Sequence, residues 1–439
     1  MIANKEESAL ELKAGVGRSL ITPRIGVELI GYFNRPGPST GVHDDLHVRT
    51  LVLDDGQTAL ALCSVELLWL RDAEIAQIRQ AVSARCGLRP EHILLFCTHT
   101  HSGPAAHDPT AWERPLADLI ADSIVEAYET RQPARLGAGY GLLIGYNINR
   151  RWIDRPVDPG VGVIRVDRAD GRPLALLGVY ACHAVVLGYD NLLISGDWPG
   201  YASRQLEAEL GVLALFGQGG AGDVNPLTET VRQRLAAGHP VETIGKLTTY
   251  YGQHGVTTPD WWNIGDRGGG TFLEAETLAR AYCAEVTRIW RSIQTEADAP
   301  LWIEQVFVDG RAGADEPRPE GLSPAQRGLL PVDGAERMEI MLAGIGNAVL
   351  ASQPGETFSE TAVEFRKSCQ QMGYAYSMMI SYANGSYAYL PPANAFPEGG
   401  YEIGWPLSLG LSRHLQARIA SAMQPILERH VPTDRPASV

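Results

Sequence analysis

The chain has no long apolar run, few cysteines and fewer basic than acidic residues. No stretch approaches the roughly eighteen consecutive apolar residues of a membrane-spanning helix, so we expect no stable membrane anchor. Lys and Arg number 37 against 51 Asp and Glu, which gives a net charge of −14. This charge argues against a nucleic acid as partner, because phosphate binding needs a basic surface, and against docking on an anionic membrane.

The six cysteines are scattered, and no two of them form a CxxC pair. Such spacing favours buried thiols in a reducing compartment over a disulfide framework. Residues 1–12 are polar and lack the apolar core of a signal peptide. We therefore expect a cytoplasmic protein whose partner is a small-molecule substrate. Nothing in the sequence points to a particular oligomeric state.

What the sequence does contain is the composition of an ordinary globular protein, with 45% hydrophobic and 20% charged residues among 439. This length suffices for one large catalytic domain or two ordinary ones. Predicted strands and helices mix without a strict βαβ rhythm, and we find no internal repeat. We therefore predict a mixed α/β (α+β) fold, a layered domain in which helices flank a mixed sheet.

Hydrophobic periodicity and turn signals predict the individual elements. Two hairpins are expected, over 48–65 with a turn at 54–56 and over 161–181 with a turn at 170–171. Further strands are predicted at 12–21, 93–97 and 212–216, and two more around Gly344 within 338–352. Helices are predicted at 72–86, 110–130, 199–210, 271–295 and 407–430. Residues 229–270 are expected to form a surface insertion, and 312–325 a second exposed loop.

The sharpest local signal is the run 98–104, Thr-His-Thr-His-Ser-Gly-Pro, which directly follows the predicted strand 93–97. Residues i and i+2 of an extended chain point to the same side, so His99 and His101 are expected to lie side by side. One of them could bind a metal ion while the other lies next to it. The Gly-Pro that follows puts the pair at the carboxyl end of a strand, where sites commonly form. Taken alone, a His-x-His motif is equally typical of surface or core histidines.

Three more polar residues follow apolar runs. His183 comes after the run 174–181 and, taken alone, is more often a core histidine. Asp197 lies in the sequence Ser-Gly-Asp-Trp-Pro and could orient a metal-binding histidine by a hydrogen bond. Glu356 lies in the sequence Gln-Pro-Gly-Glu, and such a carboxylate is either a metal ligand or a solvated turn residue.

A glycine-rich segment, 216–226, carries Asp223. Its glycines allow close backbone approach and expose N–H groups. The segment has no Gly-Lys-Ser/Thr, so it is a poor match to a phosphate-binding loop. Asp223 is either a polar group that faces a site or a solvated turn carboxylate. The tyrosines of the loop region 384–402, among them Tyr389 and Tyr401, are of a kind that usually packs with a satisfied hydroxyl.

In their order along the chain, these motifs resemble the neutral/alkaline (non-lysosomal) ceramidase family, from near the N-terminus to about residue 410. Residues 98–104 match the THTHSGP motif of the family without a change. Residues 147–150 match its NINR, 222–224 its GDV and 354–356 its PGE. The resemblance implies the fold of the family's N-terminal catalytic domain, and Zn2+ as cofactor.

The resemblance also implies a ligand set. The two histidines, the glutamate and the tyrosine that hold zinc in the family correspond to His99, His183, Glu356 and Tyr389. His101 corresponds to the second histidine of the first motif, Arg150 to the site arginine, and Tyr401 to a further site tyrosine. Two imidazoles, a carboxylate and a phenol oxygen suit zinc.

From these positions we expect an amidohydrolase mechanism. A zinc-bound water, whose pKa zinc lowers from about 15.7 toward roughly 7, attacks a carbonyl carbon. His101 serves as general base and then as acid to the leaving group. Arg150 and Tyr401 bind the oxyanion. Asp223 contributes to the catalytic site at the glycine-rich turn, and Asn225, Asn149 and Gly222 to substrate binding.

Two departures from the family pattern affect the expected substrate. Asn225 stands where ceramidases carry a serine after GDV, and an amide cannot act as a nucleophile. We also expect one hydrolase domain over 1–439, without the immunoglobulin-like C-terminal domain of the family. Both departures favour a small or polar amide over ceramide.

Other readings stay open at this point. The same chemistry would serve an ester, a lactone or a carbohydrate-derived metabolite, and Trp261 and Trp262 could form an aromatic wall for one. A non-enzymatic binding module would be expected to have lost ligands, whereas all four ligand positions carry competent residues. His43 is expected near the site, and Glu66 could be a carboxylate that supports a ligand.

Overall fold

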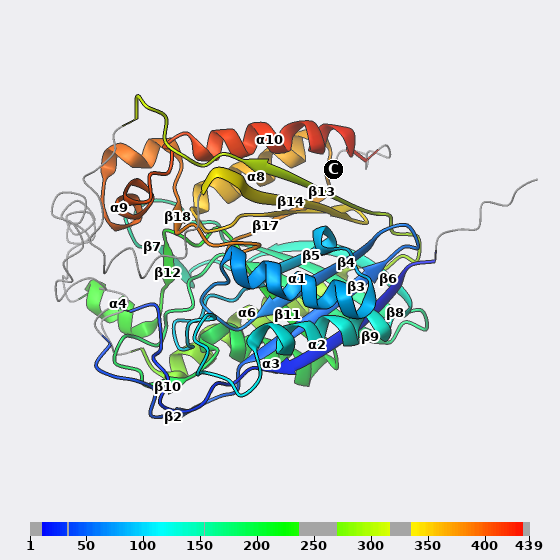
Figure 1. Cartoon of the computed structure of the whole chain (residues 1–439), viewed down its shortest axis with the longest axis horizontal. Helices are drawn as coiled ribbons and strands as arrows, with labels where there is room; N and C mark the ends of the chain where they lie inside the picture. Colours follow the sequence, from blue (N-terminus) through cyan, green and yellow to red (C-terminus); the bar gives the residue numbers. More distant parts are fainter. Residues whose placement is uncertain (1–10, 33–34, 153, 237–269, 317–334, 433–439) are drawn as a thin grey trace, which may run out of the picture.

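The computed structural model describes residues 11–32, 35–152, 154–236, 270–316 and 335–432, and two β-sheets form its centre (Figure 1). The larger sheet has the strand order β11-β9-β8-β6-β1-β3-β4-β5, and the smaller sheet has the order β13-β14-β15-β17. The strands of the larger sheet are β1 (Lys13–Leu20), β3 (His47–Asp54), β4 (Ala59–Val65), β5 (Ile93–Cys97), β6 (Gln132–Leu142), β8 (Gly160–Arg168), β9 (Pro173–Tyr180) and β11 (Leu213–Gln218). Those of the smaller sheet are β13 (Leu301–Val308), β14 (Met338–Ile345), β15 (Ala348–Ser352) and β17 (Tyr376–Ile380).

Helices cover the outer faces of both sheets. They are α1 (Asp72–Cys86), α2 (Leu116–Glu129), α3 (Asp197–Leu210), α4 (Glu229–Ala236), α6 (Phe272–Ser292), α8 (Ser359–Met372), α9 (Tyr401–Ser408) and α10 (Leu415–Arg429), with short 3-10 turns at Pro90–His92, Ala335–Arg337 and Ala393–Glu398. The remaining strands pair two by two: β2 (Gly41–Val42) with β10 (Leu193–Ile194), β7 (Asn147–Asn149) with β12 (Val224–Pro226), and β16 (Glu356–Thr357) with β18 (Tyr389–Leu390).

The packing makes four layers, helix–sheet–sheet–helix, and Figure 1 shows α8 and α10 outside the smaller sheet. Apolar side chains of the two sheets meet in one core, for example Leu62 and Phe96 of the larger sheet and Met341 of the smaller sheet. Helices α1 and α2 pack on β1, β3, β4 and β5, while α3 and α6 pack on β8, β9 and β11. Helices α8 and α10 bury their apolar faces on the smaller sheet. The predicted fold class, helices that flank a mixed sheet, is confirmed.

The larger sheet bends so that its two halves meet at one end of the molecule. Strands β1 and β6 pair at only two positions, Lys13–Pro133 and Ala14–Gln132. On the other side, the Ser64 hydroxyl of β4 donates a hydrogen bond of 2.8 Å to the Phe216 carbonyl of β11. The carboxyl ends of β5, β9 and β11 are thereby brought together.

The buried Gln218 side chain ties these strand ends to one another. Its amide nitrogen donates to the carbonyl oxygens of Cys182 (2.6 Å) and Thr98 (3.4 Å), just past β9 and β5. The main-chain N–H of Ser381, just past β17, donates to the main-chain carbonyl oxygen of Gln218 at 2.8 Å. Strand ends from both sheets therefore converge on one region, and the loops that leave them carry the predicted site residues.

Several predicted elements agree with the structure. The helix 72–86 and the strand 93–97 have the predicted bounds, and both predicted hairpins are present as β3–β4 and β8–β9. The predicted turn at Gly344 lies instead at Gly346, whose φ of 56° only glycine adopts easily. The helix predicted over 110–130 begins only at Leu116, because Pro115 has a non-helical backbone with ψ 133° and proline disfavours helical backbone at the residue before it.

The predicted C-terminal helix over 407–430 is wrong as one element. The range holds only the last two residues of α9, then a break at Gly410, whose φ is 69°, and then α10. Of the predicted insertion 229–270, the first eight residues form α4, and 237–269 lie outside the described residues, as do Trp261 and Trp262. Residues 317–325 of the second predicted loop also lie outside them. None of the described helices is both long and apolar enough to cross a bilayer.

Candidate metal centre

Three histidines meet where the strand ends converge. The loop after β5 supplies His99 and His101, and the loop after β9 supplies His183. One ring nitrogen from each histidine lies within 4.8 Å of those of the other two. The Nε2 atom of His99 is 3.1 Å from Nε2 of His183 and 3.2 Å from Nε2 of His101. Sequence positions far apart are thus brought into one cluster.

The rings of His99 and His183 are held by their other nitrogens. Nδ1 of His99 lies 2.9 Å from the Leu68 carbonyl oxygen, and Nδ1 of His183 lies 2.7 Å from the Ala221 carbonyl oxygen. A carbonyl only accepts, so each Nδ1 carries the proton and each Nε2 turns a lone pair toward the cluster. Metal-binding histidines are oriented in this way. Burial lowers the pKa of both rings to about 3, which keeps them neutral near pH 7.

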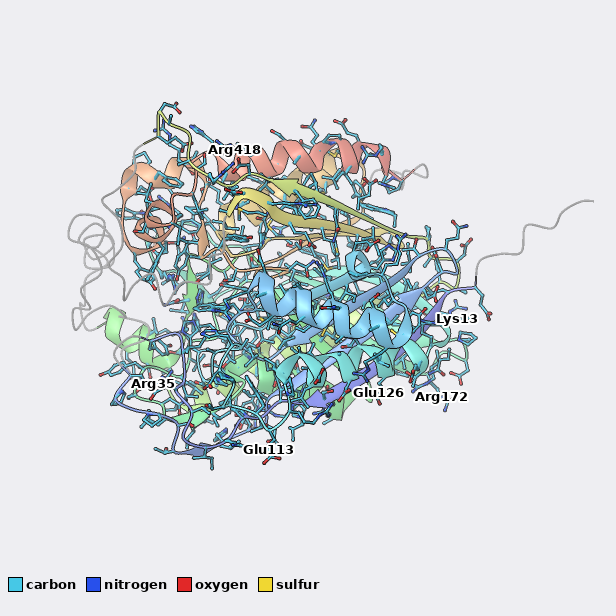
Figure 2. The ribbon with its side chains drawn as sticks, viewed as in Figure 1. Lys13, Arg35, Glu113, Glu126, Arg172 and Arg418 are labelled. Carbon is cyan, nitrogen blue, oxygen red and sulfur yellow. The ribbon has the colours of Figure 1, made fainter. Side chains whose placement is uncertain are left out.

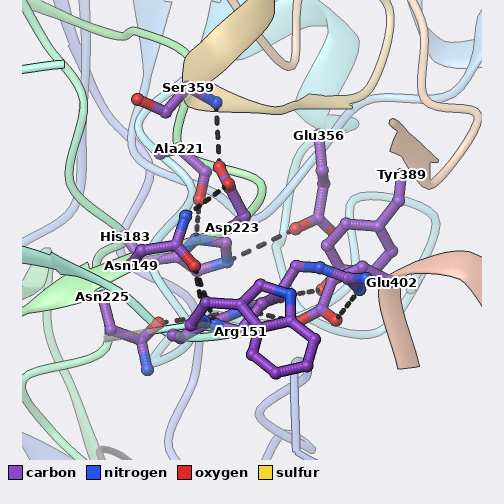
Figure 3. Close-up of polar contacts among 12 residues, drawn as sticks. Asn149, Arg151, His183, Ala221, Asp223, Asn225, Glu356, Ser359, Tyr389 and Glu402 are labelled. Atoms are coloured by element: carbon purple, nitrogen blue, oxygen red, sulfur yellow. Dashed lines mark hydrogen bonds and ion pairs between the residues drawn. The ribbon is translucent and has the colours of Figure 1, made fainter. Parts of the chain in front are cut away.

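Glu356 adds a carboxylate to the two fixed imidazoles. It lies on β16, past the turn that leaves β15. Its Oε2 atom is 3.3 Å from Nε2 of His183 and 3.7 Å from Nε2 of His99. Burial raises the pKa of the Glu356 carboxyl, and the neighbouring His99 and Arg150 oppose that rise. Figure 3 shows the carboxylate pointing at His183.

The arrangement fits a tetrahedral metal ion. Two unprotonated nitrogens that face each other at 3.1 Å have no hydrogen between them and repel unless a cation is shared. Ligand atoms bound at about 2.0–2.1 Å in a tetrahedron lie roughly 3.3 Å apart, which is near the separations of His99, His183 and Glu356. These three residues could therefore hold a metal.

His101 is held differently from the other two histidines. No hydrogen-bond partner of its buried Nδ1 atom lies among the described residues. Instead, Gly31 packs against the ring so closely that a Cβ atom there would lie 2.3 Å from Nδ1. The Tyr32 ring lies 4.9 Å from the imidazole between centroids, and Arg35 Nη2 donates to the His101 carbonyl oxygen at 2.7 Å. Packing against Gly31 and Tyr32 therefore holds the Nδ1 side of this ring, while its Nε2 atom faces Nε2 of His99 at 3.2 Å. Figure 2 shows Arg35 at the opposite end of the view from Lys13 and Arg172.

Arg150 organises the side of the centre that carries the predicted tyrosines. Its Nη2 donates to the Tyr389 hydroxyl at 2.9 Å, its Nε to Glu402 Oε1 at 2.8 Å, and its Nη1 to Asn225 Oδ1 at 3.4 Å. The Tyr389 hydroxyl also hydrogen-bonds to Glu356, and β18 pairs Tyr389 with Glu356. The Tyr401 ring packs edge-on against Tyr389, with centroids 5.4 Å apart.

Hydrogen bonds of Asp223 to Asn149 and Ser359 hold the glycine-rich loop (Figure 3). Asp223 Oδ2 accepts from Asn149 Nδ2 at 2.7 Å, and Oδ1 accepts from the Ser359 amide at 2.8 Å. A Cβ atom on Gly222 would lie 2.4 Å from the Glu356 carbonyl oxygen, so only glycine allows this approach. Both carboxylate oxygens of Asp223 are thus engaged by protein groups.

Asp197, His43 and Glu66 have their contacts with residues other than the three clustered histidines. Asp197 accepts from the amides of Leu187 (3.0 Å) and Trp198 (2.6 Å), and it is not among the described hydrogen-bond partners of the His99 and His183 rings. The His43 ring stacks on Phe272 at 3.5 Å, and Glu66 pairs with Arg49 at 2.5 Å.

Sequence reasoning missed two buried residues at the centre, Tyr382 and Glu402. Tyr382 stacks on the His99 ring with centroids 3.8 Å apart. Glu402 pairs with both Arg150 and Arg151, the second at 2.9 Å. The strand-like run before Tyr382 and the place of Glu402 next to Tyr401 were signals that could have pointed to them.

The chain belongs to the neutral/alkaline non-lysosomal ceramidase family. The model of the N-terminal part of that family matches residues 12–240, more than half of the chain.

The similar curated proteins are neutral ceramidases, and the chain spans less than half of their length. It is 26% identical over 315 residues to "Neutral ceramidase B" of Dictyostelium discoideum, which covers 63% of this chain and 43% of that protein. It is 26% identical over 255 residues to the "Neutral ceramidase" of Pseudomonas aeruginosa, which covers 49% of this chain and 37% of that one.

Solved structures share the fold. "Ceramidase complexed with C2" superposes with a TM-score of 0.74 at 19% identity and covers 98% of this chain and 77% of its own. The neutral ceramidase of Pseudomonas aeruginosa superposes with a TM-score of 0.71, also at 19% identity.

Proposed function

We propose that this chain is a zinc-dependent amidohydrolase that cleaves the amide bond of an N-acyl substrate. The observation that carries the proposal is the pair His99 and His183, whose Nδ1 atoms are fixed by carbonyls and whose Nε2 atoms face each other at 3.1 Å beside Glu356. Membership of the neutral/alkaline ceramidase family supports the reaction class.

His99, His183, Glu356 and Tyr389 are the proposed zinc ligands. The first three offer their ligand atoms at spacings that suit a tetrahedral ion, and the contact of Tyr389 with Glu356 supports the fourth. Zinc in such a site polarises a carbonyl and lowers the pKa of water toward about 7.

The other residues of the centre handle the proton and the oxyanion. His101 has its Nε2 atom 3.2 Å from that of His99, beside the metal position, where a base must lie to take a proton from the attacking water. Burial lowers the pKa of His101, which weakens the ring as a base but makes it release an acquired proton readily to the leaving amine. Arg150 and Tyr401 stabilise negative charge on the carbonyl oxygen. Asp223, Asn149 and Gly222 hold the glycine-rich turn in place, so that Asn225 lies beside Arg150, where we expect the substrate to bind.

Ceramide is the first candidate substrate, because the matched relatives are named neutral ceramidases. This runs against the expectation of a small or polar substrate, which becomes the second candidate. Asn225 favours that second candidate, because its side chain carries an amide beside Arg150 where a hydroxyl is the family pattern. Esters, lactones and carbohydrate-derived metabolites belong in the same test.

A substrate panel with and without a zinc chelator tests the proposal. The panel runs from N-acetyl to long-chain N-acyl sphingoid amides, with esters and lactones of matched acyl length. We expect cleavage of an amide that chelation abolishes and added zinc restores, and none by His183→Ala. Full activity of chelated, zinc-free protein would contradict the metal role, and cleavage of esters alone would contradict the amide assignment.

We also propose a reducing compartment such as the cytoplasm. All six cysteines are free thiols, and most of them are buried. Fractionation of the source cells with a compartment marker tests this, and recovery outside the cytoplasm would contradict it.

A further inference from the structure

The segment Ser381–Ala388, between β17 and β18, has an unusual backbone. Tyr382, Asn384 and Ala388 have positive φ angles of 54°, 53° and 55°. Among the described residues five non-glycine residues have a positive φ; these are three of them, and His99, with φ 67°, is a fourth. Left-handed backbone is unfavourable for a residue with a side chain, and it persists where the surroundings determine it. Three such residues in one short segment indicate that contacts of the surrounding structure hold this segment in its conformation.

Tyr382 touches two of the proposed ligands at once. Its ring stacks on that of His99, with centroids 3.8 Å apart and an interplanar angle of 17°. Its hydroxyl donates to Glu356 Oε2 at 3.5 Å. Tyr382 is buried, with 2% of its surface exposed, so the stacked pair cannot turn freely.

The main chain of Tyr382 bridges the two loops that carry these ligands. Its amide donates to the Gly355 carbonyl oxygen at 3.1 Å, one residue before Glu356. Its carbonyl oxygen accepts from the Cys97 amide at 3.1 Å, two residues before His99. A displacement of Tyr382 would therefore be felt at both ligands.

Asn384 holds the turn that aims Tyr382. Its amide donates to the Leu95 carbonyl oxygen at 2.8 Å, and its Oδ1 accepts from the Leu95 amide at 2.9 Å, so it pairs with the outer edge of β5. Its Nδ2 donates to Glu339 Oε1 at 2.8 Å. Glu339 on β14 is itself fixed by Arg79 of α1, at 2.7 and 2.8 Å. One side chain thus links the larger sheet to the smaller one beside the centre.

We propose that Tyr382 and Asn384 are positioning residues of the metal centre. Tyr382 fixes the plane of the His99 ring and the direction of the Glu356 carboxylate. Asn384 fixes the left-handed turn from which the Tyr382 ring projects. The inference rests on the proposed function, because it assigns His99 and Glu356 to a metal.

Zinc affinity, measured by competition with a chromophoric chelator, tests the role without any substrate. For Tyr382→Leu, which removes the stacked ring and the hydroxyl, we expect affinity about 10- to 100-fold weaker than wild type. Tyr382→Phe keeps the ring, so we expect a smaller loss. Asn384→Gly keeps the left-handed turn but removes both side-chain hydrogen bonds, and we expect a loss of about tenfold.

Tyr374→Leu and Tyr374→Phe are the matched controls. Tyr374 is also buried, and its hydroxyl donates to the Leu427 carbonyl oxygen at 2.8 Å, between α8 and α10 and away from the centre. These variants are expected to lose stability and to keep wild-type zinc affinity. If Tyr382→Leu does not fold, Asn384→Gly and Tyr382→Phe decide the question in its place.

The outcomes separate this inference from the proposed function. Wild-type zinc affinity in folded Tyr382→Leu or in Asn384→Gly overturns the positioning role alone. Loss of affinity in both, with the Tyr374 controls unaffected, supports it. Failure of the wild-type protein to bind zinc overturns the proposed function, and the inference with it.

Discussion

At the scale of single residues, the three histidines differ in what holds the nitrogen that faces away from the cluster. In His99 and His183 a main-chain carbonyl occupies that position, which leaves Nε2 free of its proton. In His101 the position is filled by the backbone of Gly31. Two rings thus present an unprotonated nitrogen to the cluster, and the third is packed beside them.

His183→Ala and His101→Ala should therefore fail in different ways. Removing a ligand nitrogen should abolish both zinc binding and activity. Removing the proposed base should lower kcat by about 10²–10⁴-fold and leave the zinc content unchanged. Metal analysis of the purified variants beside their rates checks this. His107→Ala, at an exposed histidine outside the cluster, is the control. Equal zinc loss in both variants would make His101 a ligand.

Gly31→Ala should lower activity by displacing the His101 ring. Gly31 has a φ of 105°, and an added Cβ atom would overlap His101 Nδ1 at 2.3 Å. Gly26 is a matched control, because its φ is 97° and no atom lies within 4 Å of an added Cβ. Both alanines carry a similar backbone strain, and the overlap with His101 should add a further loss of stability at Gly31 only. We expect kcat to fall at least tenfold in Gly31→Ala only; equal rates would contradict the packing argument.

At the scale of elements, the sequence predicted best where local signals are strong. The hairpins β3–β4 and β8–β9 have alternating apolar residues and Asp-Gly turns. Strand β6 was missed because its glycines interrupt the apolar pattern. Those glycines are explained by α6 and the residues just after it, since a Cβ atom would lie 2.2 Å from the Gln294 carbonyl oxygen at Gly137 and 2.9 Å from the Ile289 side chain at Gly139. A tertiary contact of this kind leaves no periodic signal in the sequence.

The same holds for the site. Motifs at strand ends identified the residues that meet at the centre, including His99, His183 and Glu356. Their roles stay predictions. Tyr382 and Glu402 were not found, because their importance comes from partners that the fold brings from other elements.

A buried ion pair between elements should make stability depend on pH. Arg49 of β3 pairs with Glu66, after β4, and with Glu207 of α3. Burial alone would raise the pKa of Glu66, but the charge of Arg49 lowers it to about 2. The folded pKa is thus below the usual value of 4.5, so the stabilisation is complete above pH 4.5 and is lost as the pH falls toward 2.

Glu66→Gln tests that dependence. At pH 7 it should destabilise the fold by about 3–5 kcal/mol, because Arg49 loses a buried partner. The difference from wild type in urea unfolding should shrink between pH 4.5 and the acid limit of folding. A difference that is constant with pH would contradict the shifted pKa. Glu129→Gln, at an exposed carboxylate at the end of α2, is the control.

At the scale of the whole molecule, the proposed ligands come from both sheets. His99 and His183 leave the larger sheet, whereas Glu356 follows β15 of the smaller one. A bound ion would therefore connect the two inner layers directly. Zinc at 100 times its dissociation constant should add about 2.7 kcal/mol to the free energy of unfolding.

Thermal unfolding with and without zinc checks this. We expect chelation to lower Tm by a few degrees in the wild-type protein and to leave Tm of His183→Ala unchanged. A Tm that does not respond to zinc would mean that no ion links the sheets.

The convergence of strand ends has a consequence for biosynthesis. The residues of the centre are spread from the first third of the chain to its last tenth, and the Gln218 side chain joins their loops only once the strands have paired. A nascent chain on the ribosome therefore contains His99 and His101 long before the complete metal centre can form. On the proposed function, the chain would stay inactive throughout translation and acquire its metal as a late step of maturation.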